Sequence, residues 1–273
     1  MSDSLNMALR RFRRQLASVR VLRVAAVVLL VIAIPWGWWP SAAIGRGVVL
    51  LALAAAFLLW IALAFGAFRC SRALETGQAL LNTGQLDDAE IWLHRAMVGL
   101  SLSPYTPIRA CQELAMLFAR RDHHHDVVVI CRELLGRRLR RLRQIWVNTS
   151  LLLADSLLCL DRVGEAYEAI RPLHDAPLSL SDRMRLLPVQ LRYELAANRT
   201  DAAAAGLAEK VQLAELLDSP RAALVHALLA EACRREAMPA QQRFLAERAH
   251  LYWDLKQLAE RYPVIAPIAS ESG

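Results

Sequence analysis

The chain has 273 residues, of which 56% are hydrophobic, and a formal net charge of +7 at pH 7. That hydrophobic fraction is high for a soluble protein, and 11 glycines and 11 prolines exclude a fibrous or low-complexity chain. The five cysteines form no CxxC pair, which indicates reduced thiols rather than a disulfide framework or a structural zinc site.

Residues 1–20 combine an apolar stripe with arginines. The stripe has spacings of four and three, which are typical of one helix face: Leu5, Leu9, Phe12, Leu16 and Val19. A basic amphipathic helix of this kind is typical of a segment that lies on anionic lipid, here through Arg10, Arg11, Arg13 and Arg14. The alternative is a charged flank that only sets the topology of the next segment.

Residues 21–68 form the predicted membrane anchor. Two charge-free stretches of 22 residues, 24–45 and 47–68, are separated only by Arg46. A helix of that length covers about 33 Å, enough for a hydrocarbon core about 30 Å thick. Because Pro35 and Pro40 interrupt the first stretch, its spanning part is expected at residues 21–39. The sequence therefore predicts a transmembrane helical hairpin, rather than buried helices of a soluble core or a cleaved signal peptide.

The flanking charges predict the orientation of this anchor. Six arginines lie before or at the start of the first span, the last of them Arg23, and Arg69 and Arg72 follow the second, whereas Arg46 alone lies between them. Positive charge concentrates on cytoplasmic flanks, so both termini are expected in the cytosol. The expected location is the cytoplasmic membrane of a bacterium.

Residues 69–261 are expected to be entirely helical, with a flexible tail at 262–273. Apolar residues recur with helical periodicity, and no alternating strand pattern is present. Thr106–Pro107 and Ser219–Pro220 are typical of helix N-termini, as is Pro239. Short turns between such helices predict stacked antiparallel hairpins.

A frame of small, apolar and turn residues recurs along this domain. Its first copy is Gly77, Leu80, Gly84, Ala89, Leu93 and Ala96. The second copy is Ala115, Phe118, Asp122, Val127, Cys131 and Leu134, and the third is Ala154, Leu157, Asp161, Ala166, Ile170 and Leu173. A fourth, weaker copy is Leu195, Arg199, Ala204, Ala208 and Val211.

This frame resembles the tetratricopeptide repeat (TPR), although its turns are spaced by 38 or 39 residues rather than about 34. The resemblance implies a TPR-like α-hairpin solenoid, with other stacked-hairpin families as the alternative. In TPR proteins the first helix of each hairpin lines a peptide groove, which implies these candidates: Gln78, Asn82, Arg109, Gln112, Arg120, Asn148, Asp155 and Tyr193. They do not reproduce the clamp that chaperone-type TPRs use on C-terminal carboxylates.

The most basic segment of the predicted domain lies between residues 132 and 143. Its arginines are Arg132, Arg137, Arg138, Arg140, Arg141 and Arg143. Interleaved leucines predict an amphipathic helix, which either has a solvated basic face or binds anionic lipid, RNA or an acidic partner. Nucleic acid is the least favoured, because the distal half of the chain is acidic and no aromatic residues are interleaved.

His123, His124 and His125, between Asp122 and Asp126, are residue types that bind transition metals. Adjacent side chains on one turn point apart, however, and no second group of ligands stands nearby in the sequence. A solvated turn is therefore the favoured interpretation, and a metal-dependent regulator or enzyme is a lesser alternative.

The sequence contains no Gly-rich phosphate loop and no HExxH, GxSxG or kinase motif. We expect a membrane-anchored, non-enzymatic protein–protein interaction scaffold without a cofactor, which presents its TPR-like domain to a protein or peptide at the cytoplasmic face. Two spans followed by repeats resemble architectures of bacterial envelope-associated scaffolds. A binder of anionic lipid or nucleic-acid surfaces through residues 132–143 is the main alternative.

Overall fold

The computed structural model describes residues 9–10, 12–13, 43–99, 104–137, 139 and 142–271, and every regular element within them is helical. This confirms the predicted all-α class. The chain divides into two compact units, residues 1–137 and 138–273, each built from helices that pack in sequence.

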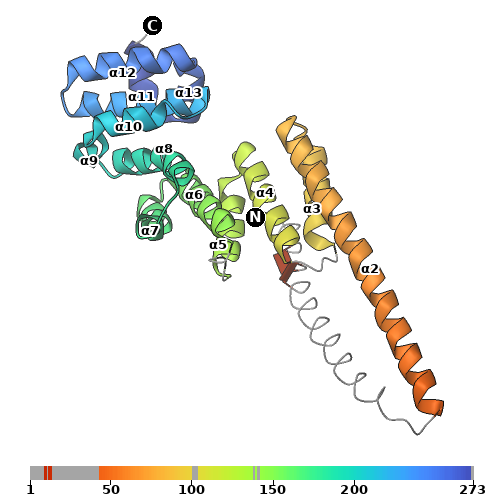
Figure 1. Cartoon of the computed structure of the whole chain (residues 1–273). Helices are drawn as coiled ribbons and strands as arrows, with labels where there is room; N and C mark the ends of the chain where they lie inside the picture. The colour runs from red at the N-terminus through yellow and green to blue at the C-terminus, as the bar shows by residue number, and fades with distance from the viewer. Residues whose placement is uncertain are drawn as a thin grey trace. The chain divides into compact units, whose positions relative to one another are not determined.

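Consecutive helices form hairpins in both units (Figure 1). The first unit contains α2 (Ala43–Asn82), α3 (Leu86–Val98), α4 (Tyr105–Arg120) and α5 (His124–Leu135). The second contains α6 (Arg143–Cys159), α7 (Val163–His174), α8 (Leu180–Ala196), α9 (Thr200–Ala204), α10 (Leu207–Ala214), α11 (Ser219–Arg235) and α12 (Pro239–Tyr252). It ends with α13 (Leu255–Arg261), the 3-10 helix η2 (Pro263–Ile265) and α14 (Ala266–Glu271).

The same backbone turn closes the first helix of each hairpin. One residue has a left-handed conformation, with φ between 53° and 80°: Gly84, Asp122, Asp161, Asn198 and Ala237. The N–H of the next residue donates to the carbonyl five residues earlier, at 2.7 to 3.0 Å, as in the Schellman motif. The sequence frame located the first three turns correctly. It placed the fourth at Arg199, one residue too late, because asparagine tolerates the left-handed region better than arginine.

Ala237 is the one member of this set that has a Cβ and no polar side chain to stabilise the left-handed turn. We expect Ala237→Gly to raise the free energy of unfolding by about 0.5–1 kcal/mol, because relief of strain exceeds the entropy that glycine adds to the unfolded chain. Gly84→Ala, whose new Cβ would meet nothing within 4 Å, should lower it through the backbone alone. Chemical denaturation measures both, and shifts of the same sign would be inconsistent with this account.

Small residues allow the hairpin helices to cross closely, as the frame suggested. A Cβ at Gly77 of α2 would lie 2.9 Å from the Leu93 side chain and 3.3 Å from the Leu93 backbone nitrogen in α3. The equivalent positions in the next two hairpins are Ala115 and Ala154, both fully buried. Larger side chains at these positions would force the paired helices apart.

α2 joins the predicted second span to the first hairpin without a break (Figure 1). The domain boundary expected at residue 69 therefore lies inside a 40-residue helix. Residues 53–82 of α2 are long and apolar enough to cross a membrane. Within the most apolar 18 residues of this segment, only 6% are buried. Large apolar side chains of α2 are exposed along this stretch: Leu51, Phe57, Leu58, Trp60, Phe65 and Phe68.

The described residues thus contain one candidate span, whereas the sequence predicts a two-span hairpin. The first predicted span, residues 21–39, lies outside the part of the chain that the structure describes. By length and composition alone, α2 gives a weak indication of a membrane protein.

Part of the N-terminal amphipathic segment packs on protein. Leu9 is 5% exposed and Phe12 is fully buried in the first unit. The Arg137 guanidinium lies 4.6 Å from the centre of the Phe12 ring, and Arg13 forms an ion pair with Glu133 of α5. The apolar residues that one interpretation assigned to lipid contact therefore contact protein at these two positions. Leu5, Leu16 and Val19 lie outside the described residues.

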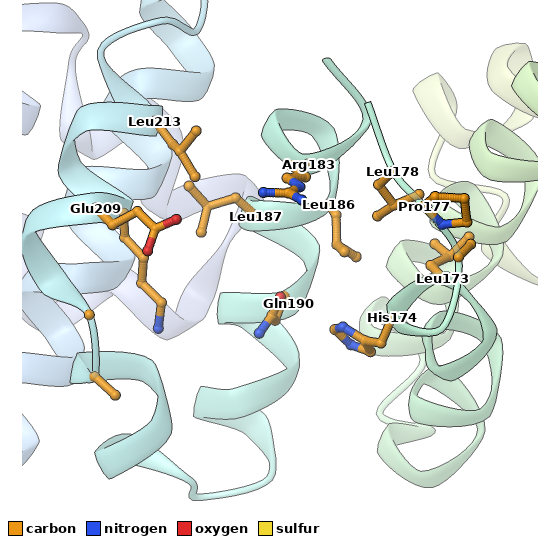
Figure 2. A pocket seen from close by; sticks show the side chains of 14 residues that line it. Leu173, His174, Pro177, Leu178, Arg183, Leu186, Leu187, Gln190, Glu209 and Leu213 are labelled. Atoms are coloured by element: carbon orange, nitrogen blue, oxygen red, sulfur yellow. The ribbon is translucent and has the colours of Figure 1, made fainter. Parts of the chain in front are cut away.

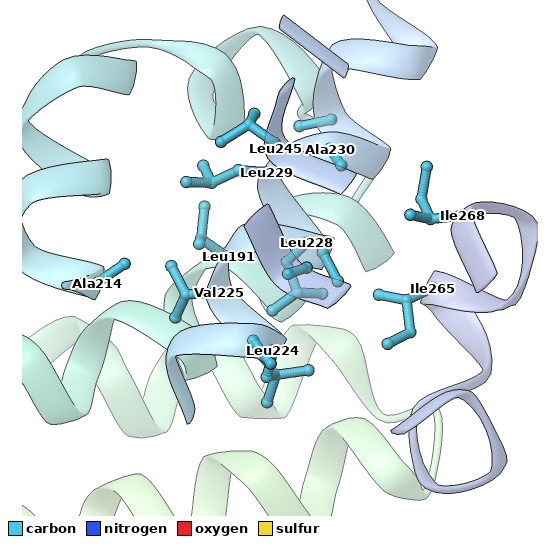
Figure 3. Packing of buried hydrophobic residues seen from close by; sticks show 14 of the residues in the cluster. Leu191, Ala214, Leu224, Val225, Leu228, Leu229, Ala230, Leu245, Ile265 and Ile268 are labelled. Atoms are coloured by element: carbon cyan, nitrogen blue, oxygen red, sulfur yellow. The ribbon is translucent and has the colours of Figure 1, made fainter. Parts of the chain in front are cut away.

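The core of the second unit surrounds α11, which is buried from Ala222 to Cys233 (Figure 3). Helices α8, α9, α10 and α12 pack against it, together with the C-terminal elements. Side chains from all sides meet around Leu228, which is fully buried. The expected flexible tail at 262–273 is wrong for its described part, because Ile265 and Ile268 are buried against this core. Apolar burial outweighs the entropy of ordering these residues.

His226 is fully buried in α11, and its ring stacks on Tyr252 of α12 at 5.7 Å. Neither ring nitrogen has a hydrogen-bond partner among the described residues. Burial lowers the pKa of the imidazole; Glu215 opposes this shift and Arg248 adds to it. The folded chain therefore holds His226 neutral.

We expect stability to fall as the pH drops below about 6.5, because the unfolded chain then binds a proton that the folded imidazole resists. The loss can reach about 1.4 kcal/mol per pH unit, and above that range the contribution is constant. His226→Phe should flatten this dependence, while His250→Phe, at an exposed position of α12, should not. Denaturation at several pH values tests the pair, and parallel curves for wild type and His226→Phe would refute the assignment.

Candidate binding groove

The second helix of the fourth hairpin is broken in the middle. α9 ends at Ala204, Ala205 is extended, and Gly206 adopts the left-handed conformation before α10 begins. The Lys210 ammonium donates to the carbonyls of Ala202 and Ala203, at 2.7 and 2.8 Å. A cation at the C-terminus of α9 satisfies carbonyls that the broken helix leaves open.

This break borders a cavity of about 420 Å³ within the second unit. One wall comes from the end of α7 and the loop after it, the other from residues 205–213, and α8 lies between them (Figure 2). The apolar lining residues include Leu173, Pro177, Leu178, Leu186, Leu187 and Leu213. Arg183, Glu209 and Lys210 add charges at its edges.

A second, more polar cavity of about 380 Å³ adjoins the first. The two share His174 and Gln190, whose side chains Figure 2 shows on facing elements, α7 and α8. The other residues that line it are Tyr167, Arg171, Asp175, Tyr193, Glu194 and Arg199. We refer to the two cavities together as the α7–α10 groove.

Buried charges lie at the floor of the groove. Gln190 donates to one oxygen of Glu194 at 2.8 Å, while the other oxygen lies 3.7 Å from the Lys210 nitrogen and has no hydrogen-bond partner among the described residues. Burial lowers the pKa of Lys210, and Glu194 partly opposes that shift. Tyr167 and Tyr193 stack at 5.3 Å. The groove thus has a buried, mainly paired set of polar groups at its base.

Tyr193 is the only one of the eight TPR-derived candidates that lines the α7–α10 groove. In the first unit, Gln78 donates to Glu113 at 2.9 Å and Arg109 to Gln112 at 3.1 Å, while Asn82 is exposed at the end of α2. In the second unit, Asn148 accepts from Arg185 at 2.9 Å, and Asp155 pairs with Arg192. Most of these polar residues therefore join neighbouring hairpins to each other.

One such contact recurs in both units. Arg120, two residues before the left-handed Asp122, donates to the carbonyl of Leu81, three residues before the preceding turn. Arg235 stands in the same register before Ala237 and donates to the Leu195 carbonyl at 3.1 Å. The arginine thus links the ends of successive first helices, a structural role that the TPR resemblance did not indicate.

The expected amphipathic helix across residues 132–143 is wrong. α5 ends at Leu135, and α6 begins only at Arg143, whose side chain is exposed, as is that of Arg132. The C-cap of α5 is Gly136, and glycine is a poor helix former. Arg137 pairs with Glu133 at 2.8 Å, and Arg13 shares the same carboxylate.

The remaining basic candidates are divided between described and undescribed positions. Arg10 is exposed, whereas Arg13 is paired with Glu133. The others lie outside the described residues: Arg11, Arg14, Arg138, Arg140 and Arg141.

The histidine turn has local partners. His123 stacks on Phe118 at 6.1 Å, and His124 Nε2 lies 3.7 Å from an oxygen of Asp122. Asp126 lies in the first turn of α5, with His123 at the N-cap. Within the described ranges, no group of three His, Cys, Asp or Glu residues has the geometry to hold a metal ion.

The sequence frame missed the groove because it treated the fourth hairpin as a weak copy of the others. The available signal was Gly206 inside an otherwise helical alanine-rich pattern, where glycine often marks a break.

No protein-family model, curated protein or solved structure matches the chain. The α7–α10 groove is therefore interpreted from its own geometry and chemistry.

Proposed function

We propose that this protein is a membrane-anchored, non-enzymatic scaffold that binds a segment of a partner protein in the α7–α10 groove at the cytoplasmic face. The observation that carries the proposal is the pair of adjoining cavities, one mainly apolar and one polar, along the broken fourth hairpin. The TPR-like turn frame supports a role in peptide recognition. In TPR proteins the first helix of each hairpin lines the groove, whereas here the groove lies between the second helices of two successive hairpins, α7 and α9–α10.

The exposed apolar surface of α2 supports the anchor. A helix that exposes phenylalanine, tryptophan and leucine side chains over a broad face removes them from water only in lipid or against a partner. Phe12 packs in the first unit, so residue 12 and the hairpins of that unit share one side of the membrane. If α2 crosses once, the chain before it must cross once more. This is the reason to retain residues 21–39 as the first span, with the arginine-rich side in the cytosol.

The groove favours an extended segment with both apolar and acidic side chains. The leucines of the first cavity suit one buried apolar side chain. Arg171 and Arg199 are exposed in the second cavity, where Glu194 is already engaged by Gln190 and lies near Lys210. An acidic residue next to the apolar one would meet the two arginines.

A displayed library of random peptides, selected on the full chain in detergent, tests the proposal. The selected peptides should combine an apolar residue with an acidic one and should bind wild type. Ala205→Trp, which fills the first cavity, should weaken binding at least about tenfold, or about 1.4 kcal/mol. Ala208→Trp on the exposed side of α10 is the matched control. Failure to select any peptide, or equal binding by Ala205→Trp, would remove the groove function.

Anionic-surface binding through residues 132–143 is the weaker alternative. Its expected helix is interrupted, and Arg13 and Arg137 already pair with Glu133. The histidine turn gives a metal-dependent role no further support.

A further inference from the structure

We propose that the cavity between α2 and α3 binds the phosphate headgroup and upper acyl chain of one anionic phospholipid. The cavity has a volume of about 430 Å³ and is lined by Gly66, Arg69, Cys70, Ala73, Trp92, Arg95 and Gly99. The proposal rests on the anchoring role of α2, and it assigns a ligand to a part of the protein far in sequence from the α7–α10 groove.

The cavity lies where the apolar stretch of α2 ends. The charge-free stretch stops at Phe68, so Arg69 marks the expected boundary between lipid and water. α3 runs back along α2 and brings its C-terminus to the same level, since a Cβ at Gly99 would lie 2.1 Å from Cys70 Sγ (Figure 1). Trp92 of α3 lines the same cavity as Gly66, and tryptophan is typical of the boundary between lipid and water.

The cations around this cavity have no carboxylate partner among the described residues. Arg69 lies over the Phe65 ring at 5.9 Å, and Arg95 lies over the Trp92 ring at 4.9 Å. In contrast, two other arginines pair with carboxylates at 2.5 to 2.8 Å: Arg109 in α4, and Arg121 in the turn after α4. Among the residues that the structure describes, no acidic side chain lines the cavity. Two unpaired guanidinium groups beside an apolar hollow complement a phosphate that carries an acyl chain.

The apolar lining decides between a lipid and a free phosphate ion. Gly66 and Ala73 have no side-chain donor for a phosphate ion, whereas they and the carbon atoms of the Trp92 ring offer an acyl chain a close contact. In the proposed complex, Arg69 and Arg95 donate to the phosphate oxygens, and the chain follows the surface of α2 toward Gly66.

The test uses the full chain in nanodiscs of equimolar phosphatidylcholine and phosphatidylglycerol. The protein is extracted with a neutral detergent, and retained lipid is identified by native mass spectrometry. Wild type should retain phosphatidylglycerol in preference to phosphatidylcholine. Arg69→Gln with Arg95→Gln should reduce retention about thirtyfold, because each arginine near anionic lipid contributes a factor of about five. Gly66→Leu, which fills the cavity without a change in charge, should also reduce it.

Arg221→Gln with Arg243→Gln removes the same charge from exposed positions of the second unit and should retain lipid like wild type. Equal retention by wild type, the Arg69/Arg95 variant and Gly66→Leu would overturn the lipid site and leave the anchor intact. Displacement of the lipid by excess inorganic phosphate would overturn it in favour of an anion site. Extraction of wild type from membranes by alkaline carbonate would overturn the anchoring proposal, and the lipid site with it.

Discussion

Replacing Leu58 with arginine should shift the insertion equilibrium of the α2 apolar segment by about 3–4 kcal/mol, more than a hundredfold. Leu58 is 66% exposed and stands near the centre of the charge-free stretch 47–68. A central arginine costs about 2.5–3.5 kcal/mol on the insertion scale, and the lost leucine adds about 0.5 kcal/mol. Residues 43–72, placed as a test segment in a host membrane protein with a glycosylation site on each side, give the equilibrium directly.

The control places arginine at Ala67, one residue before the end of the same apolar stretch. There the side chain can extend to the headgroups, so insertion should change far less. If the two variants lose insertion equally, the cost is not one of depth in the bilayer. If neither loses it, the exposed surface of α2 belongs to a protein interface instead.

Leu228→Ala should lower the free energy of unfolding by about 2–5 kcal/mol. Leu228 is fully buried in α11, where side chains from several helices converge (Figure 3). Alanine removes apolar burial and leaves a cavity that the surrounding helices fill only partly. Because α11 also supports α8 and α10, which line the groove, the variant should lose peptide binding at temperatures where wild type retains it.

Leu216→Ala is the matched control, because Leu216 is 59% exposed. It should change stability by less than about 0.5 kcal/mol. Denaturation of the full chain in detergent, followed by circular dichroism, measures both variants. Equal small losses would mean that α11 is not the centre of the second unit's core.

The sequence predicted the helical hairpins well because their turns have a local cause. A left-handed residue is required after each first helix, and glycine, aspartate and asparagine are visible at Gly84, Asp122, Asp161 and Asn198. Ala237 carries no such signal, and its turn is fixed by packing of α11 against α12. The ordered C-terminal segment was missed for the same reason, since Ile265 and Ile268 are ordered by contacts with α11 that no local pattern encodes.

The candidate site was less predictable because it depends on an irregularity. A regular repeat frame assigns binding residues by position, and it selected Asn148 and Asp155, which pair with arginines of the next hairpin instead. The groove arises where Ala205 and Gly206 break a helix and Lys210 satisfies the exposed carbonyls. These contacts join residues in different turns of the chain, so their geometry follows from tertiary packing rather than from spacing.

The central claim is that the N-terminal segment and the hairpins lie on the same, cytoplasmic face of the membrane. In the sequence they are separated by two membrane crossings. Cysteines placed at Arg10 and at Gln85, both exposed, test it most directly in a Cys159→Ser background that removes the exposed native thiol. A membrane-impermeant maleimide should label both cysteines in inverted vesicles and neither in intact cells. Labelling of one position from each side would mean a single crossing, which contradicts both the two-span anchor and the packing of Phe12 in the first unit.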